Sequence, residues 1–106
     1  MDDVQPVFTQ SCAVAGCHIG AGAQQGMDLS EGMAFGMIVG VPSQELPSMD
    51  RVEPGDKEIS YLFHKISGTQ ASVGGSGSQM PLAGCCLAQD VIDMIGAWID
   101  QGAEDN

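Results

Sequence analysis

Basic residues, aromatic residues and long apolar runs are all scarce in this chain. Lysine and arginine number 3 against 14 acidic residues, which gives a net charge of −11. This balance argues against nucleic acid as a partner, because nucleic-acid-binding proteins present basic surfaces. No stretch approaches the roughly 20 apolar residues of a membrane-spanning helix, so we expect no transmembrane segment. The acidity is compatible with docking onto a partner protein that has a basic surface, and equally with simple solubility.

The residues available for a core are few for the length of the chain. A sequence of 106 residues has room for a single domain, 1–106, with one core. Only five residues are aromatic: Phe8, Phe35, Tyr61, Phe63 and Trp98. The 15 glycines add backbone entropy that folding must overcome. The sequence therefore predicts that a bound group completes the core.

Three segments have the periodicity of amphipathic helices. In the first, Asp2 or Asp3 can cap the start and Pro6 lies in the opening turn; its apolar face is Val4, Val7, Phe8 and Cys12. In the second, Asp56 is the cap and Gly68 the end; its apolar face is Ile59, Leu62, Phe63 and Ile66. The third runs over 88–101 and stops at Gly102; its apolar face is Val91, Ile92, Ile95, Trp98 and Ile99.

The remainder of the chain is irregular. A weaker helix is predicted from Ser30 through Met37, although Gly32 and Gly36 disfavour it. No segment has the alternation of a strand, and 69–84 is rich in serine and glycine. These features predict an all-α domain of three main helices joined by long loops. Loops of that length in a small domain are typical of chains that wrap another group.

A cysteine pair followed by histidine is the strongest chemical signal. Cys12 and Cys17 are separated by four residues, and His18 follows Cys17 directly. This is the attachment pattern of c-type haem, in which two thiols add to the porphyrin vinyl groups and the histidine becomes an axial iron ligand. The usual spacing is two residues. The longer spacing here uses small residues that can bulge outward while both sulfurs reach the ring.

Two other interpretations of the cysteines remain open at this point. Cys12 and Cys17 can form a disulfide beside an exposed His18, or the three can bind zinc together with Cys85 or Cys86. The chain offers no second pair of histidines or cysteines at the spacing usual for zinc ligands. Cys85 and Cys86 can themselves form a vicinal disulfide, link to another chain, or remain two small buried thiols.

Met80 is the favoured second axial ligand. It precedes a proline in a glycine-rich loop, well downstream of His18, where the stiffened loop can hold its thioether against the iron. His64 is the rival, but its place beside Lys65 on the polar side of the second helix favours a solvated side chain.

The ordered set of motifs resembles a class I cytochrome c, more narrowly the small monohaem domains of planctomycete-type bacterial proteins. The segments that carry the resemblance cover nearly the whole chain: Val7-Phe8, Cys12 to His18, Glu53-Pro54-Gly55-Asp56, Ser60-Tyr61-Leu62, Gln79-Met80-Pro81-Leu82 and 97–103. The resemblance implies the class I cytochrome c fold around one covalent haem c. It also implies that the first and last helices cross closely, with Gly96 admitting Phe8.

On this interpretation the protein is an electron carrier and not an enzyme. Cys12 and Cys17 hold the haem, His18 and Met80 ligate its iron, and one electron passes to and from a redox partner protein. Arg51, the only arginine, suits a haem propionate, with a plain surface salt bridge as the alternative. On the same interpretation we expect a periplasmic or otherwise exported protein. Because no signal peptide is visible, the chain would then be the trimmed form. If the chain binds haem but is not an electron carrier, the alternative is a haem-based sensor or peroxidase-like protein with a displaceable ligand in place of Met80.

Overall fold

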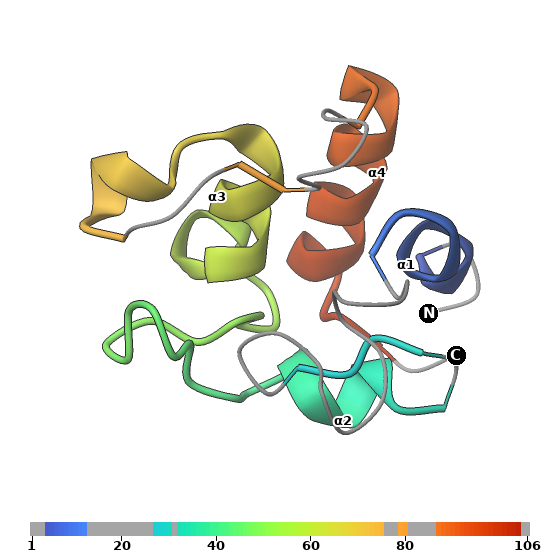
Figure 1. The fold of residues 1–106 in the computed structure, drawn as a ribbon, viewed down its shortest axis with the longest axis horizontal. Coiled ribbons are helices and arrows are strands. Elements are labelled where there is room, and N and C mark those ends of the chain that lie inside the picture. The colour runs from blue at the N-terminus through green and yellow to red at the C-terminus, as the bar shows by residue number, and fades with distance from the viewer. Residues whose placement is uncertain (1–3, 13–26, 31, 76–78, 81–86, 105–106) are drawn as a thin grey trace.

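Helices form the framework of this protein. The computed structural model describes residues 4–12, 27–30, 32–75, 79–80 and 87–104. Along the chain these contain α1 (Gln5–Ser11), α2 (Ala34–Ile38), the short 3-10 helix η2 (Lys57–Ile59), α3 (Tyr61–Ser67), the 3-10 helix η3 (Gln70–Val73) and α4 (Gln89–Asp100) (Figure 1). Within these residues β-pairing is confined to isolated bridges, Val39 with Val52 and Pro42 with Asp50. The helical character predicted from the sequence is confirmed for this part of the chain.

The first helix has the predicted apolar face. Val4, Phe8 and Cys12 are buried and Val7 packs partly buried against them. Val4 occupies the N-cap position without a side-chain hydrogen bond, and a proline lies in the first turn. The predicted capping residues Asp2 and Asp3 lie outside the described residues.

The second predicted helix is interrupted, which the sequence analysis did not foresee. Ser60 is extended, with φ −107° and ψ 112°, and separates η2 from α3. Its hydroxyl accepts from the Glu53 N–H at 2.8 Å and donates to the Asp56 carbonyl at 2.8 Å. A serine that bonds to the preceding turn competes with helix formation. Asp56 therefore caps only η2, and Ile59 is 48% exposed and not part of the apolar face. Gly68 ends α3 as predicted, with φ 78°.

The last helix is close to its prediction, with one correction. Ile92, Ile95 and Ile99 are buried, and Gly102 follows the end with φ 117°. Gly96, however, faces α3 and η2. A Cβ atom added there would lie 2.9 Å from the Cε1 atom of Phe63 and 3.1 Å from the Cδ atom of Lys57. The predicted packing of Phe8 against Gly96 is wrong, because the close approach is between α4 and α3, which lie side by side in Figure 1.

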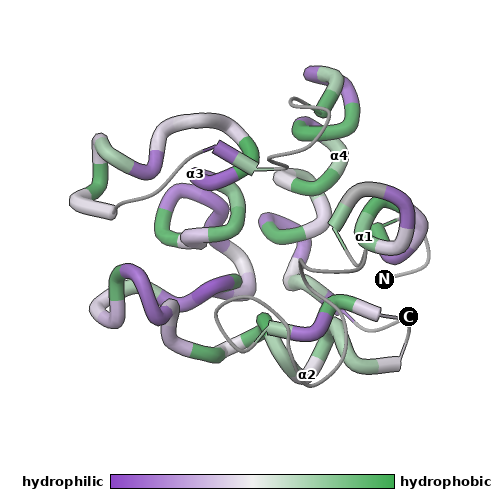
Figure 2. The backbone as a smooth tube through the Cα atoms, in the orientation of Figure 1, coloured by the Kyte–Doolittle hydropathy of each residue, from purple (hydrophilic) through white to green (hydrophobic). Residues whose placement is uncertain are grey.

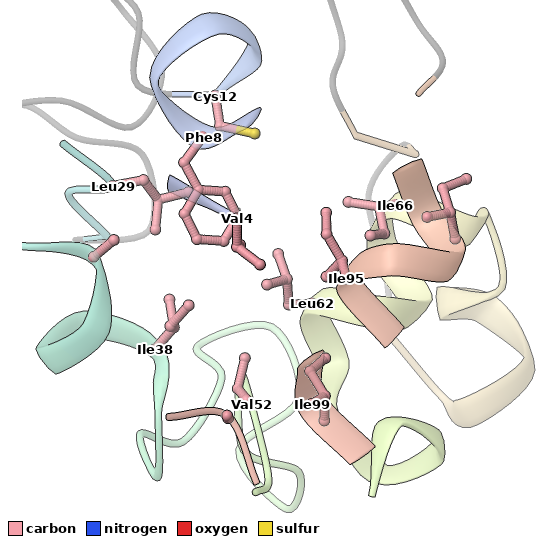
Figure 3. Close-up of a cluster of buried hydrophobic side chains, with 13 residues drawn as sticks. Val4, Phe8, Cys12, Leu29, Ile38, Val52, Leu62, Ile66, Ile95 and Ile99 are labelled. Carbon is pink, nitrogen blue, oxygen red and sulfur yellow. The ribbon is translucent and has the colours of Figure 1, made fainter. Parts of the chain in front are cut away.

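One apolar cluster joins the helices. Figure 3 shows side chains of α1, α3 and α4 directed toward a common centre, with Cys12 at its edge next to Phe8. Its buried members are Val4, Phe8, Cys12, Leu29, Ala34, Ile38, Val52, Leu62, Ile66, Ile92, Ile95, Ile99 and Ala103. Figure 2 shows these hydrophobic stretches alternating with hydrophilic ones along α3 and α4. Within the described ranges, none of the helices combines the length and the hydrophobicity needed to span a bilayer.

Candidate cofactor pocket

A pocket opens beside the apolar cluster, between the end of α1 and one face of α3. The space between its walls, with the open solvent at its mouth included, is about 580 Å³. Its lining comes from five separate parts of the chain: Cys12; Met27 and Leu29; Ser43, Gln44 and Glu45; Arg51 with Tyr61, Leu62, Lys65 and Ile66; and Met80. Residues distant in sequence thus converge on one space.

One side of the pocket is apolar and contains sulfur. Leu29, Leu62 and Ile66 are 1%, 7% and 2% exposed, so they form a fixed wall. Cys12 closes the end of α1, where its N–H donates to the Phe8 carbonyl at 2.9 Å. Met27 and Met80 add two thioethers. This wall can exclude water from an apolar ring and offers soft sulfur atoms to it.

The position of Met80 is set by α3. Its N–H donates to the Lys65 carbonyl at 2.9 Å, and the Gln79 side chain donates to the Ile66 carbonyl at 3.0 Å. Both acceptors lie in the last turn of α3, where carbonyls have no partner within the helix. The segment 79–80 is thereby held alongside the helix that supplies the pocket wall.

The pocket lining also contains charged side chains. Arg51 and Lys65 are both 7% exposed, and they are two of only three basic residues in the chain. With Glu45 they give the lining a net charge of +1, in a chain of net charge −11. Buried cations cost free energy unless anions or hydrogen bonds compensate them. The pocket therefore brings together two cations and one anion, although the whole chain is acidic.

Hydrogen bonds and an ion pair orient the charged side chains of the lining. One carboxylate oxygen of Glu45, Oε1, accepts from the Tyr61 hydroxyl at 2.7 Å and pairs with the Lys65 Nζ at 3.1 Å. The Arg51 Nη1 donates to the Met37 carbonyl at 2.7 Å. Burial lowers the pKa of Arg51, because removal from water disfavours its charged form. The Arg51 side chain is 7% exposed, so it does not lie on the surface as the salt-bridge alternative assumed.

Three of the five residues predicted to hold the cofactor are described, and the structure brings all three together. Cys12, Arg51 and Met80 line the same pocket although up to 68 positions separate them. The other two, Cys17 and His18, lie outside the described residues, as do Cys85 and Cys86.

His64 is not part of the pocket lining, but the reason given from the sequence is wrong. It is buried, at 6% exposure, and not solvated. Its Nε2 donates to the Glu58 carbonyl at 2.7 Å, so its Nδ1 faces the Thr69 hydroxyl at 2.7 Å. Both ring nitrogens are occupied in joining η2 to the turn after α3, which leaves His64 a structural role.

Sequence reasoning did not assign the other nine lining residues to the pocket, among them Met27, Glu45, Tyr61 and Lys65. A signal was present for two of them. Tyr61 and Lys65 are four positions apart and share a helix face, and Lys65 is one of three basic residues in the chain. Glu45 and Met27 come from irregular segments that carry no periodicity.

No protein-family model, curated protein or solved structure matches this chain. The function is therefore argued from the sequence motifs and the pocket alone.

Proposed function

We propose that this chain is a class I c-type cytochrome domain that carries single electrons on one covalent haem c. The observation that carries the proposal is the convergence of Cys12, Met80 and Arg51 on one pocket. The sequence motifs assign these residues to thioether attachment, iron ligation and propionate contact. That assignment uses no information about their positions in space.

The chemistry of the pocket fits such a cofactor. A haem has an apolar ring and two carboxylates, and the pocket pairs an apolar wall of Leu29, Leu62 and Ile66 with the cations Arg51 and Lys65. The Cys12 thiol lines the pocket together with this apolar wall. It would add across one vinyl group of the haem, with its sulfur on one carbon and its hydrogen on the other carbon of that group. Cys17 and His18 would supply the second thioether and the proximal ligand. When bound, the haem supplies a one-electron iron couple.

The residues of this chain would tune and protect that couple. A thioether from Met80 favours the reduced iron and raises the reduction potential, and exclusion of water by the apolar wall acts in the same direction. The pocket lining combines an apolar wall, two thioethers and a Glu45–Lys65 ion pair. Outer-sphere electron transfer, without an enzymatic step, is the reaction that the pocket supports best.

The chain would exchange electrons with a redox partner protein that has a basic surface. Outside the pocket, nine described acidic side chains are partly or fully exposed: Asp28, Asp50, Glu53, Asp56, Glu58, Asp90, Asp93, Asp100 and Glu104. Opposite charge on a partner would steer the encounter. Because attachment of haem c takes place outside the cytoplasm in bacteria, the proposal includes a periplasmic or otherwise exported location.

An absorption spectrum of protein from a cytochrome-maturing host tests the proposal. We expect sharp reduced bands that remain with the polypeptide after acidic organic extraction, and a weak far-red band from thioether ligation of ferric iron. Protein without haem, from a host shown to mature other cytochromes, would refute the proposal. It would leave the disulfide or zinc interpretation.

Three methionine variants identify the thioether ligand. Met80→Ala should abolish the far-red band and lower the reduction potential, while Met33→Ala, at a site 44% exposed, serves as the matched control. Met27→Ala is needed because Met27 also lines the pocket. Loss of the band in Met27→Ala alone would transfer the role to Met27. Tight carbon monoxide binding by the reduced wild type at neutral pH would favour a haem sensor.

A further inference from the structure

The pocket lining contains one carboxylate of the protein itself, that of Glu45, beside the cations Arg51 and Lys65. Tyr61 and Lys65, one turn apart on α3, both direct their polar atoms to Oε1 of Glu45. The Lys65 and Glu45 side chains are only 8% and 16% exposed. A carboxylate held by a hydroxyl and an ammonium is a complete anion site, and here a residue of the chain fills it.

Glu45 comes from a loop whose two arms are hydrogen-bonded to each other at the base. At the base, the Arg51 N–H donates to the Val41 carbonyl at 2.7 Å and the Ser43 N–H to the Met49 carbonyl at 3.0 Å. Of the described residues 43–49, none belongs to the buried apolar cluster. Moving Glu45 outward would therefore expose little core surface, and its polar contacts with α3 are what hold it inward.

The bound group of the proposed function has the same anionic chemistry as Glu45. Two carboxylates entering beside Glu45 would place three anions against the two cations of the lining. Like charges in a partly buried space repel strongly because solvent screens them little. Exchange of Glu45 for a cofactor carboxylate avoids this repulsion and keeps the bonds from Tyr61 and Lys65.

We propose that Glu45 occupies the Tyr61–Lys65 site in the cofactor-free protein and is displaced into solvent by a cofactor carboxylate. Glu45 thus competes with a cofactor carboxylate for the bonds from Tyr61 and Lys65. This inference rests on the proposed function, because it takes the cofactor to be a porphyrin with free carboxylates.

Hemin binding by the full-length chain, made without maturation, tests the competition. The probes are hemin and its dimethyl ester, which lacks free carboxylates, and binding is followed by the Soret band and quenching of Trp98. Glu45→Gln should bind hemin more tightly, on the order of tenfold for one charge-assisted hydrogen bond, and should bind the ester as the wild type does. Glu58→Gln, an exposed glutamate outside the pocket lining, is the matched control and should change neither affinity.

The matured protein gives a second measurement that does not require the haem-free chain to fold. If Glu45 has been displaced, Glu45→Gln leaves the thermal midpoint of the haem-loaded protein unchanged, whereas Lys65→Met lowers it. A fall caused by Glu45→Gln would show that the Glu45–Lys65 pair persists, and would overturn the inference.

Two further outcomes separate this inference from the proposed function. The exchange is refuted if wild type and Glu45→Gln bind hemin with equal affinity, or if Glu45→Gln gains equally for hemin and for the ester. The cytochrome proposal still stands in that case, provided that the matured wild type carries haem. A wild type that neither binds hemin nor carries covalent haem after maturation refutes both.

Discussion

Substitution of Gly96 tests whether α3 and α4 pack as closely as the structure has them. In a helix interior, glycine to alanine ordinarily stabilises by about 1 kcal/mol, because alanine loses less backbone entropy on folding. At Gly96 the added carbon would lie 2.9 Å from a Phe63 ring carbon, closer than any normal contact. Overpacking of this kind costs about 1–3 kcal/mol. We therefore expect Gly96→Ala to destabilise by about 1 kcal/mol net.

Gly36 provides the matched control. It lies inside α2, is exposed, and an added Cβ would meet nothing within 4 Å. Gly36→Ala should show the uncompensated helix preference, a stabilisation of about 0.5–1 kcal/mol. The two substitutions are chemically identical, and their expected effects differ in sign because of the close contacts at Gly96, the shortest of which is with Phe63.

Urea unfolding of the haem-loaded protein measures both free energies, and a double-mutant cycle assigns the cause. In a Phe63→Leu background the ring is gone, so Gly96→Ala should lose most of its cost, with a coupling of about 1 kcal/mol or more. If Gly96→Ala stabilises the wild type as much as Gly36→Ala does, the close approach of α3 and α4 is wrong. A coupling near zero would show that Phe63 is not the residue that clashes with the added methyl group.

Two further predictions concern the turn between Glu53 and Ser60. Ser60→Ala removes the partner of the Glu53 N–H and should cost about 2 kcal/mol, which lowers the thermal midpoint by about 8 °C or more. Glu53 has a raised pKa, caused first by its hydrogen bond with Asp50, then by burial and by the charges of Asp50 and Asp56. Its protonated form is favoured by folding, so this contribution is present at low pH and lost as pH rises through the raised pKa. Glu53→Gln should therefore raise the thermal midpoint at pH 7, with a gain that shrinks toward about pH 4.

Each of these two predictions has its own control, a second serine variant for Ser60 and the pH dependence for Glu53. Ser72→Ala, at an exposed serine of η3, should stay within about 0.5 kcal/mol of the wild type. A loss for Ser60→Ala no larger than this would mean that its hydroxyl does not bridge the turn. For Glu53, a stability difference independent of pH between 4 and 7 would contradict the electrostatic cause.

The sequence was informative wherever periodicity and burial coincide. The apolar faces of α1 and α4 could be predicted because residues such as Phe8, Ile95 and Ile99 repeat at helical spacing. The break at Ser60 could not, because it depends on a hydroxyl bonding back to two residues of the preceding turn. The contact of Gly96 was misassigned for a related reason: helical spacing says which face a residue occupies, not which neighbouring helix meets that face.

The pocket was predictable only in part. The sequence motifs singled out Cys12 and Met80, and the scarcity of arginine drew attention to Arg51. Glu45 could not be found, because its position depends on where the loop 43–49 lies relative to α3. The expectation for His64 illustrates the same limit: neighbouring polar residues suggested exposure, whereas the fold buries the ring between two hydrogen-bond partners.

The placement of two of the three basic residues inside the pocket has a kinetic consequence. The lining carries +1, so the rest of the chain carries −12. If the chain binds haem as we propose, the two carboxylates of a porphyrin approaching from solution are repelled by that outer charge before they reach the cations that would hold them. Added salt shortens the range of the repulsion more than it weakens the buried contacts. The loading rate should therefore rise with ionic strength, opposite to the behaviour of electrostatically steered association.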